Sequence, residues 1–142
     1  MKRNIILSVC LCAVLLLVTG CGRERTLVCT QTASGVDITF NVGFKGNTIK
    51  TMDFSYDMDL TSYNDAQIEA IGKQDLCTTV KNSMAQYKDA FTDCKQNIEN
   101  KHLRLSSRFD VDKIAKNQLD KMTSPEKAKE DLETQGYSCT IN

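Results

Sequence analysis

The sequence has little of what several functional classes require, and these absences narrow the question first. Basic and acidic side chains balance at 18 each over 142 residues, so the excess of Lys and Arg that marks a nucleic-acid binder is missing and no nucleic-acid partner is expected. Tryptophan is absent, and proline and histidine occur once each. Apolar residues make up 41% of the chain and charged residues 25%, which argues against a disordered polymer. One small globular domain is therefore expected.

The chain also lacks a hydrophobic run long enough for a transmembrane helix. Its apolar stretch from Ile5 to Val18 covers 14 positions, interrupted only by Ser8, whereas a spanning helix needs about 20 residues. The stretch follows Lys2 and Arg3 and leads into small residues, which is the pattern of a secretory signal. We therefore expect the protein to be exported and its leader to be removed.

The end of the leader, Val18-Thr19-Gly20-Cys21, resembles the lipobox of bacterial lipoproteins. The resemblance implies that the Cys21 thiol, a nucleophile as its thiolate, receives a diacylglycerol and that cleavage falls just before it. Two acyl chains hold a protein on a membrane much more firmly than one. We expect a signal peptide at residues 1–20, a lipidated tether at 21–25 and one domain at 26–142, on the extracytoplasmic face of the cell membrane of a Gram-positive-type cell. An ordinary signal peptide with an incidental cysteine is the alternative.

Four cysteines remain for the exported domain: Cys29, Cys77, Cys94 and Cys139. An exported domain lies in an oxidising compartment, so two disulfides are expected. The spacings of 48, 17 and 45 residues lack the close ligand pairs of a zinc site, so no metal is expected. Three pairings are possible. Cys29 and Cys139 lie in strand-like segments at the two ends of the domain and meet if these strands are neighbours. Cys77 then pairs with Cys94, provided that the helix after Cys77 ends near Tyr87.

Three strands are predicted in the first half of the domain. Residues 36–44 and 52–60 alternate apolar and polar side chains, which indicates two strands of a sheet with one buried face. Gly46-Asn47 between them suits a tight hairpin turn. A turn at Ala33-Ser34-Gly35 joins them to the earlier strand around Cys29, which gives a three-stranded meander.

An amphipathic helix is predicted after the meander. It begins at Asn64, which together with Gln67 resembles a capping box. Its apolar stripe continues to about Tyr87, and Gly72 is a candidate break. Alternation of apolar and polar side chains resumes after Cys94, which indicates a return to strands.

The remaining elements complete the predicted fold. A second hairpin turns about Glu99-Asn100-Lys101, and Ser124-Pro125-Glu126 marks the start of a short helix that Gly136 ends before a last strand. The element order β-β-β-α-β-β-α-β predicts an α+β fold, with an antiparallel sheet of about six strands and helices packed on one face.

Several short segments together resemble the YehR-like family of small bacterial lipoproteins. They are the lipobox, Phe44-Lys45-Gly46-Asn47, Ala85-Gln86-Tyr87-Lys88, Arg108-Phe109-Asp110-Val111-Asp112 and Leu132-Glu133-Thr134-Gln135-Gly136-Tyr137. The resemblance covers nearly the whole mature chain and implies a lipid-anchored α+β domain. It brings no established activity and no catalytic residues. The four mature cysteines look like an addition to the family pattern.

Two groups of charged residues are candidates for a site. The first group is acidic: Asp53, Asp57, Asp59 and Asp65. It lacks the third spaced acid and the glycine of a calcium loop, so a solvated strand face is the favoured interpretation. The second group is His102, Arg104 and Arg108 on the outward side of a later strand. These residues either form weak surface ion pairs with the acidic strand or hold an anionic ligand, and we favour the ion pairs.

No catalytic motif accompanies these groups. Ser106 and Ser107 lack a G-x-S-x-G context, no phosphate-binding glycine loop is present, and Met52, Met58 and Met84 are interpreted as core filler. We therefore expect a non-enzymatic protein without a cofactor, which contacts an envelope protein or a cell-wall partner through its exposed sheet face. The alternative is binding of a small molecule or peptide in a groove between helix and sheet. A closed apolar pocket of about several hundred Å³ would favour that alternative, whereas a flat, filled domain would favour the first.

Overall fold

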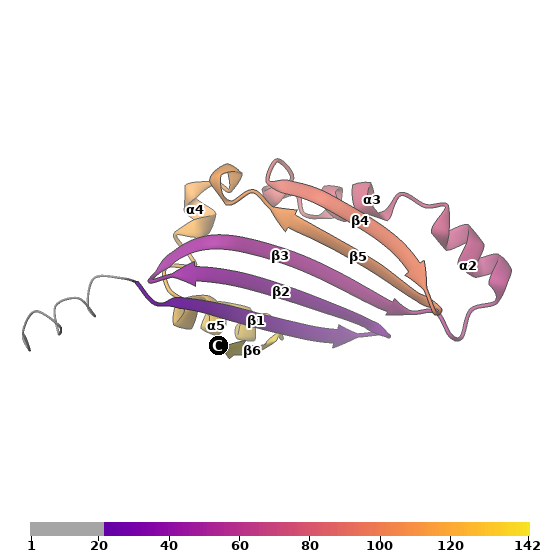
Figure 1. Cartoon of the computed structure of the whole chain (residues 1–142), viewed down its shortest axis with the longest axis horizontal. Helices are drawn as coiled ribbons and strands as arrows, with labels where there is room; N and C mark the ends of the chain where they lie inside the picture. Colours follow the sequence, from indigo (N-terminus) through magenta and orange to yellow (C-terminus); the bar gives the residue numbers. More distant parts are fainter. Residues whose placement is uncertain (1–21) are drawn as a thin grey trace, which may run out of the picture.

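A computed structural model describes residues 22–142, which form an α+β domain (Figure 1). The strands are β1 Glu24–Ala33, β2 Val36–Lys45, β3 Thr48–Asp59, β4 Phe91–Glu99, β5 His102–Phe109 and β6 Ser138–Ile141. The helices are α2 Asp65–Gly72, α3 Leu76–Ser83, α4 Lys116–Leu119 and α5 Pro125–Thr134, with single 3₁₀ turns η1 Ala85–Tyr87 and η2 Val111–Lys113. The predicted fold class is confirmed. The signal peptide and Cys21 lie outside the described residues.

All six strands form one antiparallel sheet in the order β4-β5-β3-β2-β1-β6. The meander β1-β2-β3 makes one half, and the hairpin β4-β5 adds to its β3 edge. The last strand returns beside the first, as the expected cysteine pairing requires. Within residues 22–142 the chain forms the whole sheet, its core and both disulfides, so this segment has what an independently folding domain needs.

The expected boundary between tether and domain is two residues too late. Glu24 and Arg25 were assigned to the tether by the sequence, but they are paired in β1 with Lys45 and Phe44 of β2. The side chain of Arg25 turns to the inner side of the sheet and pairs there with Glu126 at the start of α5. Because of the strand pairing and this ion pair, β1 is longer at its start than the alternation of apolar residues in the sequence indicates.

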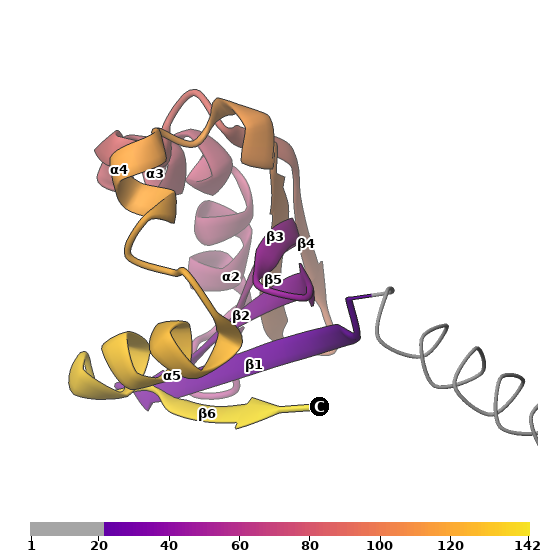
Figure 2. The same ribbon diagram turned by 90° about the vertical axis from the view of Figure 1, so that its left-hand side faces the viewer.

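All the helices lie on one side of the strongly twisted sheet (Figure 2). The buried core therefore consists of side chains on the inner sheet face and the helices that cover it, among them Leu27, Val42, Phe44, Leu105, Phe109 and Ala128. Helix α5 lies against β1 and β6, and α3 lies against β4. The helices thus cover the two edges of the inner face more closely than its centre.

The helical segment expected between Asn64 and Tyr87 is two helices. The predicted capping box is present: Gln67 N donates to Asn64 Oδ1 at 2.9 Å, and Asn64 N donates to Gln67 Oε1 at 3.0 Å. Helix α2 ends at Gly72, and Asp75 starts α3 by accepting a hydrogen bond from Thr78 N at 3.0 Å. Gly72 is therefore the break that the sequence suggested.

Helix α4 was not predicted. It has only four residues, and Ala115 precedes it without a side-chain hydrogen bond to its first turn. The sequence pattern gives little sign of such a helix, because short helices without a capping side chain depend on tertiary packing.

Candidate functional site

The two disulfides join the cysteines that the sequence favoured, and the first fastens the two ends of the domain. Cys29 and Cys139 face each other across β1 and β6 with 4.1 Å between their Cα atoms. Thr26 and Asn142, three residues away, exchange both backbone hydrogen bonds. Hydrogen-bonded and non-hydrogen-bonded residue pairs alternate along antiparallel strands, so the cysteine pair is a non-hydrogen-bonded one, where the strands approach most closely. The bridge closes a loop of 110 residues, which is worth about 4–5 kcal/mol in the chain-entropy model.

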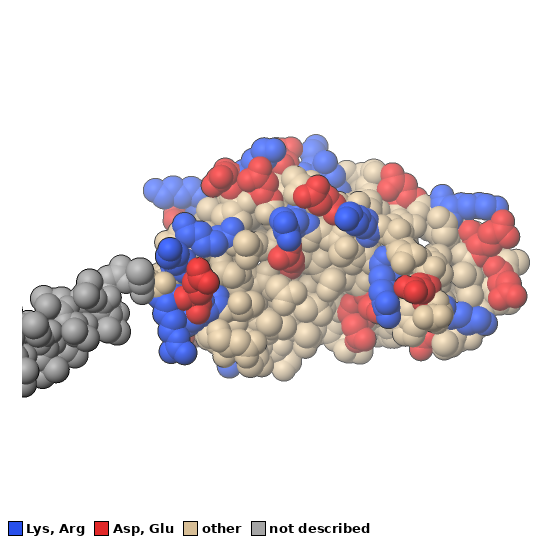
Figure 3. Space-filling view, in the orientation of Figure 1, with Lys and Arg blue, Asp and Glu red and all other residues tan. Residues whose placement is uncertain are grey.

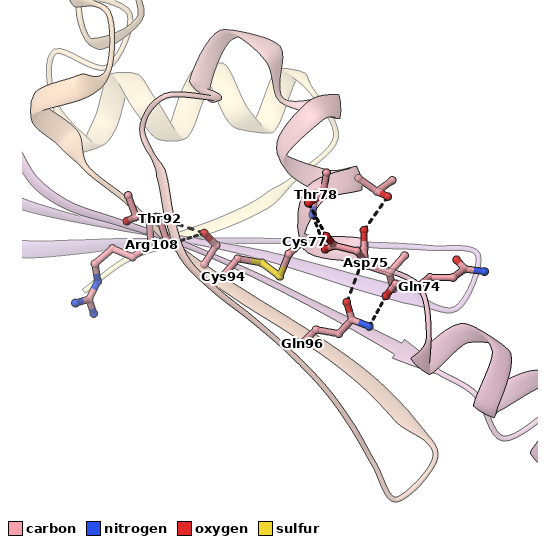
Figure 4. Close-up of a disulfide and its surroundings, with 11 residues drawn as sticks. Gln74, Asp75, Cys77, Thr78, Thr92, Cys94, Gln96 and Arg108 are labelled. Carbon is pink, nitrogen blue, oxygen red and sulfur yellow. Dashed lines mark hydrogen bonds between the residues drawn. A yellow bond between two sulfur atoms is a disulfide. The ribbon is translucent and has the colours of Figure 1, made fainter.

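The second disulfide, Cys77–Cys94, joins α3 to the edge strand β4 (Figure 4). A β-bulge makes it possible. The register of β4 against β5 shifts between Thr92 and Lys95, and Asp93 has φ 50°. The extra residue changes the alternation, so that Phe91 and Cys94 both turn to the helices. The freed Thr92 carbonyl accepts a hydrogen bond from the buried Ser107 hydroxyl at 2.6 Å.

A second contact fastens the same helix to the same strand (Figure 4). The Gln96 side chain accepts from Leu76 N at 3.0 Å and donates to the Gln74 carbonyl at 2.9 Å. One amide thus satisfies two backbone groups at the break between α2 and α3. The disulfide and this amide together fix the start of α3 and the direction of the chain toward η1.

The charged residues that the sequence singled out meet on the outer sheet face. Asp57 lies opposite Arg104, and Asp53 lies opposite Arg108, in the β3–β5 register. Each pair has 3.0 Å between the arginine Nε and a carboxylate oxygen. His102 Nδ1 lies 2.8 Å from the other oxygen of Asp57. The ion-pair interpretation is therefore confirmed for these residues.

Hydrogen bonds between these groups change their titration. The hydrogen bond from His102 is the largest cause that lowers the pKa of Asp57, and Arg104 lowers it further. The hydrogen bond to Asp53 raises the pKa of Arg108. Each arginine already has a carboxylate partner, which leaves little unbalanced charge for an anionic ligand. Red and blue side chains accordingly alternate along the upper part of this face (Figure 3).

The acidic residues do not gather into one site. Asp59 accepts a hydrogen bond from Thr61 N at 2.8 Å, and this bond lowers its pKa. Asp65 lies in the first turn of α2, beyond the strand. In the described part of the chain, no three His, Cys, Asp or Glu side chains are arranged to hold a metal ion. Residues 22–142 also contain no helix with the length and apolar character needed to cross a bilayer.

The inner face of the sheet holds a groove that the sequence did not locate. Its floor is formed by side chains of β2, β3 and β5: Phe40, Val42, Met52 and Phe109. Its volume is about 570 Å³, within the range of small-molecule sites. The groove lies between α5, which packs on β1 and β6, and α3, which packs on β4. Val42, Met52 and Phe109 in its floor are themselves nearly fully buried.

Side chains from three separate segments form the walls of the groove. Met84 and Tyr87 come from the end of α3 and from η1, Met122 from the connection between α4 and α5, and Leu132 and Tyr137 from α5 and the residues after it. Tyr87 stands edge-on to Phe109 with ring centroids 5.9 Å apart, and Tyr137 stands edge-on to Phe40 at 5.6 Å. These aromatic contacts hold wall and floor together.

Polar groups surround the apolar interior of the groove. The rim has amide and hydroxyl groups with one charge of each sign, contributed by Ser83, Gln86, Gln118, Lys121, Asp131 and Gln135. Burial raises the pKa of Tyr87, with Asp131 as a smaller cause, and burial also raises the pKa of Tyr137. Both phenols are therefore neutral at physiological pH. The lining suits binding of an apolar or amphipathic molecule.

The sequence contained only part of the signal for this groove. Met52 is buried in the core and Met84 packs against it, as expected of core filler. Both of them, and Tyr87 at the end of the predicted helix, also line the groove. Met122 was missed because its segment carries no strong pattern. A weak signal was available in the repeated methionines, which adapt to irregular spaces and binding surfaces.

Comparison with known proteins gives limited information. No protein-family model matches the chain, and no curated protein matches it. Two solved structures are similar. A Streptococcus pneumoniae protein is 15% identical, covers 83% of this chain and 84% of its own, and has a TM-score of 0.49. The E. coli YehR protein is 16% identical, covers 84% and 92%, and also has a TM-score of 0.49. The fold described above follows from the pairing of this chain's own strands and not from these two similarities.

Proposed function

We propose that this protein is a lipid-anchored envelope lipoprotein whose domain binds a small apolar or amphipathic molecule in the inner groove. The observation that carries the proposal is the groove of about 570 Å³, with its apolar floor and polar rim. The volume lies in the range that the alternative expectation from the sequence named, but the groove is open on one side, whereas that expectation was for a closed pocket.

The anchor is proposed from the sequence. Val18-Thr19-Gly20-Cys21 has the lipobox pattern after a basic and apolar leader, and the shorter segments quoted above resemble those of the YehR-like lipoproteins. The start of β1 at Glu24 also limits the distance between the anchor and the domain. Only residues 22 and 23 separate the lipidated cysteine from the sheet, so the anchor would keep the domain close to the membrane surface.

Contact with an envelope protein or cell-wall partner through the outer sheet face is the second candidate function. An area without charged side chains lies over β1 and β2 in the lower part of that face (Figure 3). Its outward positions carry hydroxyl groups, including Thr26, Thr30 and Thr39. This area is the observation that favours the candidate, but it has no hollow of the depth found on the inner face.

The groove can be tested with an uncharged fluorescent dye. Residues 22–142, with both disulfides formed, should bind Nile red at one saturable site, because the groove offers an apolar interior. Leu132→Lys places a charge against the groove wall and should weaken dye binding by at least about tenfold, since a buried unpaired charge is costly.

Thr134→Lys is the matched control, because it adds the same charge to the same helix but Thr134 does not line the groove. This variant should bind the dye as the unaltered domain does. Dye binding that is not saturable, or that Leu132→Lys leaves unchanged, would remove the groove from the proposal.

A further inference from the structure

A second hollow adjoins the groove at the end of the domain where the chain leads to Cys21. Its volume is about 760 Å³, and its lining comes from the β2–β3 turn, η2 and α4 with the residues after it. Phe109 and Met122 line both hollows. Met122 is half-buried and unbranched, so its flexible side chain can change position where the two hollows adjoin.

The mouth of this end hollow lies beside the start of the described chain. Gly46 N donates to the Arg23 carbonyl at 3.0 Å, and a Cβ added to Gly22 would come within 3.0 Å of Gly46 N. The next residue of the same turn, Asn47, lines the hollow. In Figure 2 the viewer looks at this end of the domain. A bilayer held at Cys21 would therefore face the mouth.

The chemistry of the two hollows changes from the mouth inward. The charged residues that line the end hollow are Lys50 and three acids, Asp110, Asp112 and Asp120. The interior is apolar, with the flexible thioethers of Met52, Met84 and Met122 together with aromatic rings. The predominance of acids disfavours an anionic head group, whereas the interior suits a flexible hydrocarbon.

We propose that the end hollow and the groove together hold one unbranched hydrocarbon chain of a membrane lipid. The chain enters at the mouth beside Asn47, passes Met122 and reaches the floor at Phe40. This inference rests on the proposed ligand-binding function of the groove. The occupant is a separate lipid, because stable attachment of the protein needs both acyl chains of Cys21 in the bilayer.

A chain-length series tests the inference. Single-chain amphiphiles of 8 to about 14 carbons with one uncharged head group would displace Nile red from residues 22–142. Affinity should rise about fourfold per added methylene, as burial of each methylene contributes about 0.8 kcal/mol, and should stop rising when the hollows are full. Among twelve-carbon compounds, the one with an anionic head group should bind more weakly than the neutral and cationic ones, because acids predominate in the lining of the end hollow.

Two matched variants test the path of the hydrocarbon. Met122→Lys places a charge at the passage and should weaken the longest chain by at least about tenfold. Met58→Lys is the control, because Met58 is half-buried on the same face of β3 as Met52 but lines neither hollow. Met122→Leu should retain binding, and circular dichroism of all three variants checks that they fold.

The outcomes separate this inference from the proposed function. If Nile red binds but affinity for amphiphiles is independent of chain length, the hydrocarbon inference is wrong and the groove proposal stands. If Nile red does not bind, both fall. If lipidated protein in phosphatidylcholine vesicles excludes a photoactivatable twelve-carbon probe that residues 22–142 bind, the protein's own anchor is the occupant and the inference is overturned.

Discussion

Asp57 shows how a single residue of the outer face obtains its partners. Its two carboxylate oxygens contact different side chains, His102 Nδ1 at 2.8 Å and Arg104 Nε at 3.0 Å. Both partners come from β5, at register positions 57↔104 and 59↔102. The cluster therefore depends on the pairing of β3 with β5, two strands that lie far apart in the sequence.

The lowered pKa of Asp57 predicts a loss of stability in acid. Its pKa in the folded domain lies below the ordinary value of 3.8, so the folded state binds the proton less readily than the unfolded chain. The stabilising contribution is complete above pH 3.8 and is lost as the pH falls through the lower, folded pKa. Asp57→Asn should remove less than about 1 kcal/mol at pH 7, because the pair is partly exposed and screened.

Urea denaturation at pH 7 and pH 3 measures this effect. The stability difference between the unaltered domain and Asp57→Asn should shrink at the lower pH. Asp89→Asn is the control, because Asp89 is exposed and forms no ion pair within residues 22–142. A difference that grows toward pH 3 would contradict the assignment of Asp57.

At the scale of elements, the wall of the groove depends on α3. The Cys77–Cys94 bridge and the Gln96 amide fasten its start to β4, and its end leads to Met84 and Tyr87 in the wall. Neither α2 nor α3 has a buried residue, but α3 lies against β4. The bridge and the Gln96 amide therefore hold α3 in place where burial alone does not.

Replacement of Cys77 and Cys94 by alanine should loosen this segment selectively. A bridge closing a loop of 17 residues is worth about 3 kcal/mol in the chain-entropy model. Amide hydrogen exchange should accelerate most in residues 65–87 and less in β1, β2 and β3, and Nile red binding should weaken because the wall moves.

The matched control is replacement of Cys29 and Cys139, which removes a bridge far from this wall. That pair should lower the free energy of unfolding more, since its loop is longer, without selective exchange at 65–87. Equal acceleration throughout the sheet in the Cys77 and Cys94 variant would show that the bridge does not act locally.

For the whole molecule, the proposed attachment to the membrane depends on the expected leader and on Cys21. Cys21→Ser should leave an unprocessed precursor that takes up no labelled palmitate, because the thiolate that attacks the lipid donor is gone. Cys12→Ser, in the same leader, should be lipidated and cleaved normally. Labelling of the Cys21→Ser protein would refute the lipobox assignment.

Much of the fold could be predicted, because local physics sets it. The alternation in β2 and β3, the capping box of Asn64 and the Ser124-Pro125 start of α5 are properties of neighbouring residues. The antiparallel sheet and both cysteine pairs followed from them. The groove could not be predicted in the same way, since its lining comes from residues 40 to 137 and the four-residue α4 has no local signal.

The sequence by itself determined the strand alternation and the number of cysteines in residues 22–142, because each depends on residue type and short-range spacing. The tertiary structure decided the β4 bulge that turns Cys94 toward α3, the pairing of Asp57 with Arg104 and the groove over the central strands. These features arise where segments distant in sequence pack against one another. The distance between α3 and α5 over the sheet depends on the packing of the entire domain. No local sequence pattern predicts that distance.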